Sequence, residues 1–420
     1  MSRTIILAVS TSNQAATLAP VATHLAARGW CLVGLSLEMY FGLPVRWPSS
    51  EYLHTVILEN PTPCDKKLWD CTPSQLEMLG CSFWFESRKL LQALKPSLVV
   101  LGNDRGFLER MLIKRARMAG ARTVLVQDGV LTGNSQQTPH PSPLSRTKHM
   151  IWKIFASVGP ERWGPAPFLK SPTPCYGIGD LDALAVSDHH TANLLLQRGI
   201  RKERIFVTGQ PRFDRLWRIR EEAALHQRAL AEKYQGRVPV VLATQPMAEW
   251  GEVDHDDYRR YLYSILEASC VYRDRMILLI RPHPSEDPAS YTRLASAVAP
   301  DSSAVVTDWD TQTLTAASAG LITAYSTCAL EAIILDRPLL LVNPFRVEQG
   351  LPYHAEGVAL EIQDLALVQD AIRTVFLERL HWDQIRLRRK TFLDKFVGPL
   401  DGCSSERVAR LIEQVASGSQ

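Results

Sequence analysis

The sequence predicts an α/β protein built from two Rossmann-like, doubly wound domains. Three observations lead to this fold class. Short apolar runs alternate with segments whose apolar residues recur at helical spacing. The runs are continuously apolar, which is typical of parallel strands covered on both faces. The alternation stops in a charged stretch near the middle of the chain and then restarts, which indicates two separate sheets.

The first domain is expected over residues 1–213. A strand at 4–10 precedes a helix at 18–29, which ends at Gly29, and a second strand at 31–36 follows. Strand, helix and strand in this order form the unit of a parallel sheet. The later elements of this domain are strands at 96–102, 122–129, 182–187 and 204–210, and helices at 107–120 and 190–199.

A charged helical stretch without strands, residues 214–236, is the expected linker to a second domain over 237–400. We expect the closing segment, 401–420, to form a helix that packs back on the first domain. The second domain is expected to hold strands at 238–245, 276–284, 304–308, 320–325 and 338–343, and helices at 258–270 and 327–335.

The segment 133–174 interrupts the rhythm and is rich in Pro, Ser and Trp, with the basic stretch SRTKHMIWK. Long excursions inside compact domains are often functional. Two interpretations stay open, a lid or acceptor-facing loop and a plain surface insertion.

Composition limits the function classes. The chain is 46% hydrophobic and 22% charged, as folded proteins are, and its net charge of +3 argues against a nucleic-acid partner. Eight scattered cysteines without a CxxC pair, no stretch of about 20 apolar residues and no signal peptide indicate a reduced, cytoplasmic protein. Weak basicity leaves room for a small anionic ligand or for peripheral contact with the inner membrane face.

Ligands of doubly wound sheets bind beyond the carboxyl ends of the strands. One strand ends in the stretch RPHP, which holds Arg281 and His283. Proline fixes its own φ and restricts the residue before it, so the two prolines predetermine the orientation of the imidazole. Either this is a rigid turn with a solvent-facing histidine, or His283 donates to a phosphate or a leaving-group oxygen.

A second strand end reads AYSTCALEA, where Ser326 or Thr327 caps the following helix. Unpaired N–H groups at a helix N-terminus, together with hydroxyls, also suit a phosphate. Glu331, one turn into the helix, is either a solvated helix residue or an acceptor for ribose hydroxyls.

Two strand ends lie in the first domain. Asp128 follows the strand in VLVQDGV and is either an ordinary turn aspartate or a general base for an incoming hydroxyl. The stretch VTGQPRFDRL, with Gly209, is interpreted as a structural hinge. The sequences DHH at 188–190 and HDD at 255–257 lack the spacing of a standard metal site, so no metal is expected.

The order of these motifs resembles that of bacterial capsule sialyltransferases and Kdo transferases, which are GT-B type glycosyltransferases. VTGQPRFDRL is similar to the VTGNPRFD of surface-carbohydrate proteins related to the non-hydrolysing UDP-GlcNAc 2-epimerases. CDP-glycerol glycerophosphotransferases of teichoic-acid synthesis share an HP turn and a serine turn. The resemblance runs from the opening SNQAATLAPVATHLAARG to the last helix and implies a GT-B fold with two domains facing across a crevice.

The resemblance implies roles for individual residues of the second domain. His283 would contact the nucleotide phosphate and assist the leaving group, aided by the charge of Arg281. Ser326 and Thr327 would form the hydroxyl pair near that phosphate. Epimerases have two glycines after the serine, so Thr327 and Cys328 argue against the epimerase reading.

In the first, acceptor-side domain, Asp128 and Gly129 match the acidic-glycine motif that holds the proposed base. Many relatives have a second acid where this chain has Gln127. GT-B transferases generally need no bound metal, and no cofactor is expected.

The resemblance therefore implies an inverting, metal-independent transfer of a sugar from a CMP- or UDP-type nucleotide sugar to a hydroxyl of a surface glycan or glycolipid. Three alternatives stay open: transfer of a polyol phosphate from a CDP-polyol, an isomerase like the UDP-GlcNAc 2-epimerases, and a catalytically inactive GT-B scaffold. The donor base, the sugar, the acceptor, the linkage and the oligomeric state are left undetermined.

Overall fold

The computed structural model describes residues 3–48, 51–61, 67–129, 168, 176, 177 and 179–418, with Trp69 described by its backbone alone. The loop expected at 133–174 therefore lies, apart from Phe168, outside the described residues. The chain divides into two compact units. The first unit comprises Met1–Asp214 and Lys395–Gln420, and the second comprises Arg215–Asp394.

The first unit is built on a seven-stranded parallel sheet in the order β3-β2-β1-β4-β5-β6-β7. β1 lies near the centre and is buried along almost its whole length, as its continuously apolar sequence predicts. The strands are β1 (Thr4–Val9), β2 (Cys31–Ser36), β3 (His54–Ile57), β4 (Leu98–Leu101), β5 (Arg122–Val126), β6 (Ala183–Val186) and β7 (Ile205–Val207).

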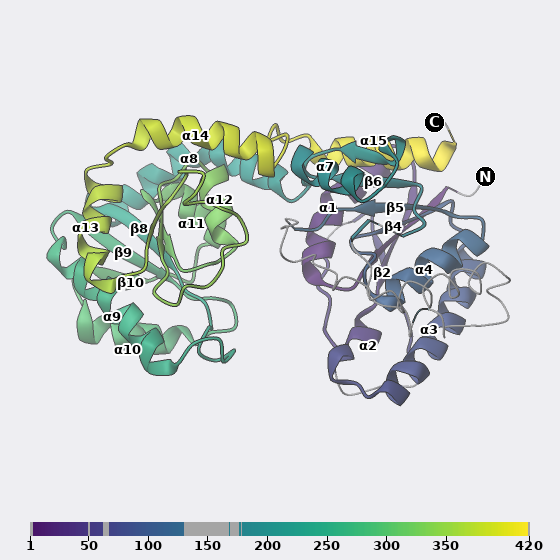
Figure 1. Cartoon of the computed structure of the whole chain (residues 1–420), viewed down its shortest axis with the longest axis horizontal. Coiled ribbons are helices and arrows are strands. Elements are labelled where there is room, and N and C mark those ends of the chain that lie inside the picture. The colour runs from purple at the N-terminus through teal and green to yellow at the C-terminus, as the bar shows by residue number, and fades with distance from the viewer. Residues whose placement is uncertain are drawn as a thin grey trace. The chain divides into compact units, whose positions relative to one another are not determined.

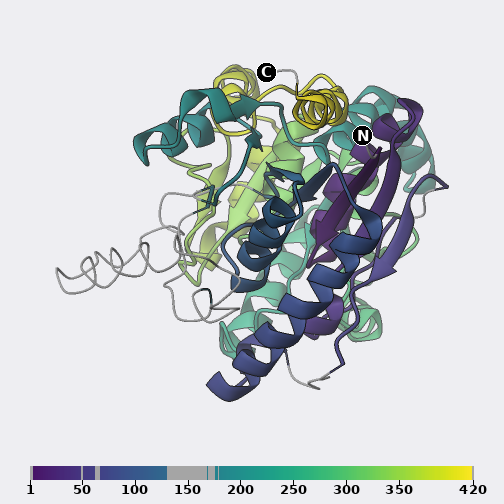
Figure 2. The same ribbon diagram turned by 90° about the vertical axis from the view of Figure 1, so that its right-hand side faces the viewer.

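Helices cover both faces of this sheet. Successive side chains of a strand point to opposite faces, so Ile5 and Leu7 pack with α1 (Ser12–Ala27) and α15 (Ser404–Ser417), and Ile6 packs on the other face. The helices of that other face are α3 (Pro73–Leu94), α4 (Phe107–Met118) and α7 (His189–Gln197). Figure 1 labels these elements, and in Figure 2 the dark-blue α3 and α4 lie in front of the strands.

The second unit is built on a six-stranded parallel sheet in the order β10-β9-β8-β11-β12-β13. Its strands are β8 (Val238–Ala243), β9 (Met276–Arg281), β10 (Ser303–Val305), β11 (Gly320–Thr323), β12 (Leu339–Val342) and β13 (Leu360–Ile362). One face packs against α9 (His255–Val271), α10 (Pro288–Val298) and α13 (Val368–Ile372). α11 (Thr311–Ala317) and α12 (Cys328–Ile334) contact β8, β11 and β12 (Figure 1).

Two long helices cross the boundary between the units in sequence. α8 (Phe213–Lys233) begins in the first unit and continues in the second, within the stretch expected as a linker at 214–236. α14 (Trp382–Phe396) ends where the chain re-enters the first unit. α15 follows it and packs on α1 and β5.

The stretch VTGQPRFD anchors this returning segment within the first unit. The carboxylate of Asp214 accepts hydrogen bonds from the N–H groups of Ser404 and Ser405, 3.0 and 2.7 Å away, and so caps α15. Gly209 has φ +78°, and a Cβ there would lie 2.4 Å from Ser404 Oγ. The stretch predicted as a hinge therefore packs against the start of α15.

Each unit alternates parallel strands with helices on both faces of its sheet. The prediction of two Rossmann-like, doubly wound sheets is confirmed.

Candidate functional site

The carboxyl ends of β9, β8 and β11 bring the predicted donor-side residues to one edge of the second unit's sheet. The three strands are neighbours and parallel, so the segments that follow them leave the sheet on the same side. His283 follows β9, and Ser326 follows β11. With β8 between them and about 4.8 Å between adjacent strands, these turns are about two strand spacings apart.

The imidazole of His283 has a defined tautomer. The N–H of Ser285 donates to His283 Nδ1, 3.2 Å away, and Ser285 Oγ lies 2.8 Å from the same nitrogen. A backbone N–H can only donate, so Nδ1 is the acceptor and Nε2 carries the proton of the neutral ring. The ring is half-buried and packs edge-on against Trp250, with centroids 5.7 Å apart. Nε2–H is therefore a donor held in a fixed direction.

Glu286 fixes the backbone of this turn. Its Oε2 accepts from the His283 N–H at 2.8 Å and from the hydroxyl of Thr244, the residue after β8. Its Oε1 accepts from the Tyr291 hydroxyl at 2.6 Å. The pKa of Tyr291 is raised by burial and by its bond to Glu286, so the hydroxyl stays a donor at neutral pH. The carboxylate thus joins β8, the His283 turn and α10.

The same edge continues to the Ser326 turn through the residue after Thr244. Gln245 Oε1 accepts from the N–H of Tyr325 at 3.3 Å, and Tyr325 directly precedes Ser326. Ser326 Oγ in turn accepts from the N–H of Cys328 at 3.2 Å, which identifies Ser326 rather than Thr327 as the side-chain cap of α12. The Thr327 side chain is exposed.

Glu331 and Arg281 lie in the same unit but are engaged with protein groups. Glu331 is buried, and its Oε1 accepts from Gln312 Nε2 of α11 at 2.9 Å. The Arg281 guanidinium donates to the Val306 carbonyl at 3.2 Å and to Thr311 Oγ1 at 3.4 Å. A ribose contact by Glu331 and a phosphate contact by Arg281 both stay predictions.

Asp128 lies in the first unit, where Gln127 separates it from the end of β5 at Val126. The carboxylate is half-buried and accepts from the Thr17 hydroxyl of α1 at 3.2 Å. Burial raises the pKa of Asp128, while the charge of Arg212 and the Thr17 hydrogen bond lower it, and burial dominates. An aspartate whose pKa is raised is a stronger base than an ordinary one.

Gln127 explains the absence of a second acid before Asp128. Its Oε1 accepts from the Ser187 N–H at 2.9 Å, and its Nε2 donates to the Gly129 carbonyl at 2.9 Å. A glutamate could accept the first bond but could not donate the second. The amide therefore holds the turn that carries Asp128, with Gly129 at φ +80°.

Two buried carboxyl groups after β4 were not predicted. Asp104 accepts from the N–H groups of Gly177 and Gly179 at 3.0 Å, and Glu109 accepts from Ser10 Oγ at 3.3 Å. Burial raises the pKa of both acids. Glu109 sits on the first turn of α4, where its spacing is that of an ordinary helix residue, so the sequence carried no signal for its burial.

The described residues contain no group of three or more His, Cys, Asp or Glu side chains that could hold a metal ion. In the DHH stretch, Asp188 caps α7. Asp254, which directly precedes the HDD stretch, caps α9. Within the described part of the chain, no helix is long and apolar enough to cross a membrane.

Residues 180–414, more than half of the chain, match the CDP-glycerol:poly(glycerophosphate) glycerophosphotransferase family. The chain belongs to this family. The matched span contains the His283 and Ser326 turns but not Asp128. No curated protein sequence matches the chain significantly.

Solved structures show the fold-level relationships of this glycerophosphotransferase-family chain. The wall teichoic acid polymerase TagF, soaked with CDPG, is 14% identical with a TM-score of 0.53, over 99% of this chain and 89% of that one. The UDP-GlcNAc 2-epimerase from Neisseria meningitidis, bound to UDP-GlcNAc, is 14% identical with a TM-score of 0.61, over 98% and 100%. The calicheamicin glycosyltransferase CalG4 is 12% identical with a TM-score of 0.58, over 100% and 99%. At such identities the likeness shows the fold alone.

These comparisons confirm the GT-B class of fold, and the family match makes the chain a transferase-type enzyme. They also confirm the predicted resemblance to the CDP-glycerol glycerophosphotransferases. The resemblance to capsule sialyltransferases and Kdo transferases stays a prediction.

Proposed function

We propose that this enzyme transfers a polyol phosphate from a CDP-activated donor, of the CDP-glycerol type, to a hydroxyl of an acceptor. The observation that carries the proposal is the family match over residues 180–414, which includes the edge where His283 and Ser326 stand. The sequence leaves this reaction open as an alternative to sugar transfer, and the family match favours it.

In the proposed reaction, the acceptor oxygen attacks the phosphorus that bears the polyol. A new P–O bond forms to the acceptor, and the P–O bond to the bridging oxygen of the diphosphate breaks. CMP leaves with that oxygen, and the acceptor loses its proton. The enzyme therefore needs a group that stabilises the departing phosphate and a base for the hydroxyl proton.

We assign the first task to His283. Its Nε2–H is fixed by the Ser285 contact to Nδ1, so it can donate to a phosphate oxygen without reorganising. The hydroxyls of Ser326 and Thr327 follow β11 at the same edge and would donate to the same diphosphate. Arg281 and Glu331 are assigned to the nucleotide as well, and both would have to exchange protein contacts for ligand contacts.

We assign the second task to Asp128. Its half-buried carboxylate, with a raised pKa, is suited to accept the proton of the acceptor hydroxyl. The Gln127 amide holds its turn in place, so the residue that replaces the second acid of relatives acts by positioning.

Transfer of a sugar from a nucleotide sugar is the second candidate. This candidate rests on the motif resemblance to capsule sialyltransferases and Kdo transferases, and the GT-B fold shared with CalG4 is compatible with it. In that case the acceptor would attack a carbon, and the product would gain no phosphorus. An epimerase would require no acceptor at all, and a scaffold would bind partners without turnover.

The reaction is tested by incubating the full chain with CDP-glycerol and a short synthetic oligo(glycerol phosphate), then following phosphorus by ³¹P NMR and nucleotides by chromatography. The proposal expects one CMP released for each new phosphodiester. Nucleotide-sugar consumption by the same preparation, with CDP-glycerol left intact, would favour the second candidate instead. The acceptor, drawn from surface glycans or glycolipids, is then identified by competition.

A further inference from the structure

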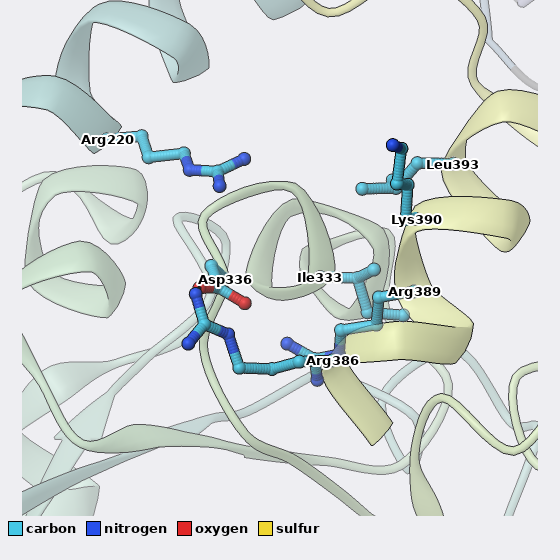
Figure 3. A pocket seen from close by; sticks show the side chains of 7 residues that line it. All are labelled: Arg220, Ile333, Asp336, Arg386, Arg389, Lys390 and Leu393. Carbon is cyan, nitrogen blue, oxygen red and sulfur yellow. The ribbon is translucent and has the colours of Figure 1, made fainter. Parts of the chain in front are cut away.

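A basic pocket lies at the opposite edge of the second unit's sheet, near the start of β12. Its volume is about 220 Å³, far above the roughly 10–15 Å³ that one water needs. Figure 3 shows Arg220 reaching in from α8, while Arg386, Arg389 and Lys390 come from α14. Asp336, between α12 and β12, is the one acid in the lining.

The charge of this pocket is strongly positive. Four basic groups and one acid line it, so the net charge is four minus one, or three positive charges. Arg386 extends across to Asp336, with Nη2 and Oδ2 2.9 Å apart (Figure 3). Arg220 Nη1 is 3.5 Å from the Ile334 carbonyl, a weak contact. The acid thus satisfies one guanidinium and leaves the others in excess.

Arg389 gives the pocket lining a buried positive charge. The residue is only 2% exposed, its Nε and Nη2 both donate to the Val358 carbonyl, and its guanidinium lies 4.6 Å from the centre of the Trp382 ring. Nη1 has no hydrogen-bond partner among the described residues. Burial lowers the pKa of Arg389 to about 9, so the group is still charged at neutral pH. A buried, charged donor without an acceptor is costly.

We propose that this pocket binds a phosphate group. Phosphate oxygens can accept from the Arg220 and Lys390 side chains together, with the buried charge of Arg389 in the same lining, and an arginine fork matches phosphate geometry. Three excess positive charges favour a multiply charged oxyanion over a single carboxylate. The ligand is either a soluble phosphorylated molecule or the headgroup of an anionic phospholipid.

This site is separate from the proposed donor site. β12 has four residues, so about 13 Å of strand separates its two ends. His283 and Ser326 follow strands at the carboxyl edge, whereas Asp336 precedes β12. Phosphate binding here therefore does not depend on the proposed function.

The test is titration calorimetry of the full chain with inorganic phosphate. The pocket variant carries Arg220→Gln and Lys390→Gln, two side chains outside the core, so Arg389 and the fold are left intact. Arg388→Gln is the matched control, because Arg388 is exposed on the same helix and does not line the pocket. We expect the pocket variant to bind at least about tenfold more weakly, as loss of charged hydrogen bonds predicts, and Arg388→Gln to bind as the wild type does.

A second arm distinguishes the two sources of phosphate. Co-sedimentation compares vesicles of phosphatidylglycerol with vesicles of phosphatidylcholine, and adds Leu387→Gln, since Leu387 of α14 is 76% exposed beside the basic residues. If the chain binds phosphatidylglycerol vesicles, and both the pocket variant and Leu387→Gln weaken this binding, the ligand is a lipid headgroup. Phosphate binding that depends on the pocket without vesicle binding identifies a soluble ligand. The proposal is overturned if neither probe binds, or if Arg388→Gln weakens binding as much as the pocket variant does.

Discussion

His283 is restrained on three sides. Its Nδ1 accepts from Ser285, its backbone N–H donates to Glu286, and its ring packs edge-on against Trp250. These contacts leave Nε2–H as the free donor of the ring among the described contacts. The two prolines, visible in the sequence, restrict the backbone, whereas the tautomer depends on Ser285 and could be assigned only from the structure.

Asp128 is the other residue with a defined chemical environment. Burial raises its pKa, and Thr17 and Arg212 oppose that rise. A general base must be deprotonated, so activity should increase as the pH rises through this pKa. The acid limb of the pH profile should therefore lie above that of an ordinary aspartate.

Thr17→Val tests this environment. The change removes the hydroxyl that donates to Asp128 and favours its charged form, so the pKa should rise further. We expect the acid limb of kcat/KM to move to higher pH while the alkaline limb stays unchanged, measured as a full pH–rate profile. Thr55→Val, on the exposed face of β3, is the control. An acid limb that does not move would remove Thr17 and Asp128 from the proton transfer.

At the scale of elements, the turn after β9 depends on Glu286, which joins three segments. Glu286→Ala leaves the His283 N–H and the hydroxyls of Thr244 and Tyr291 without their shared acceptor. We expect CDP-glycerol to bind about tenfold more weakly, because the His283 turn loses the acceptor that fixes its backbone; a tenfold change corresponds to about 1.4 kcal/mol. Calorimetry measures the affinity, and Glu267→Ala, exposed on α9, is the control. Unchanged affinity beside a lowered melting temperature would make Glu286 purely structural.

The closing helix depends on a cap that comes from far away in the sequence. Asp214→Ala removes the acceptor of the Ser404 and Ser405 N–H groups at the start of α15. We expect the first unit to lose about 1–2 kcal/mol of unfolding free energy, measured by urea denaturation. Glu221→Ala, exposed on α8, should leave the stability unchanged. Equal stability of Asp214→Ala and the wild type would contradict the anchoring role of VTGQPRFD.

The central strands were predictable because both their faces are buried, which makes their sequences continuously apolar. β3 and β13 were not predicted, because their sequences, HTVI and LEI, are short and include polar residues. α3 was also not predicted, although Thr72 and Gln75 form a capping box that marks its start.

The site was predictable in part for a similar reason. Strand ends locate His283, Ser326 and Asp128, but the hydrogen bonds of Glu286 and Gln245 join strands far apart in the chain. Side-chain directions across neighbouring strands decide these contacts, and no local pattern encodes them.

At the scale of the whole molecule, the GT-B fold is shared by transferases and epimerases with different chemistry, so the fold does not define the donor. The proposed CDP-activated donor implies a cytidine nucleotide. In a thermal-shift screen with CMP, CDP, UDP and GDP, we expect the cytidine nucleotides to raise the melting temperature most, by mass action on the folded state. A larger shift with UDP would favour a nucleotide-sugar donor.

The two assigned roles belong to different units, His283 to the second and Asp128 to the first. Each unit can therefore be disabled separately by one substitution. Loss of a positioned acid or base group lowers turnover by about 100-fold or more, but only a group that touches the nucleotide in the ground state also changes its affinity.

The most direct test is calorimetry with CDP-glycerol, run beside turnover, for His283→Ala and Asp128→Ala. His226→Ala, on α8 of the second unit, is the matched control. We predict that both variants lose turnover, that His283→Ala also binds CDP-glycerol more weakly, and that Asp128→Ala binds it as the wild type does. Equal loss of affinity in both variants, or full turnover in either, would contradict the assignment.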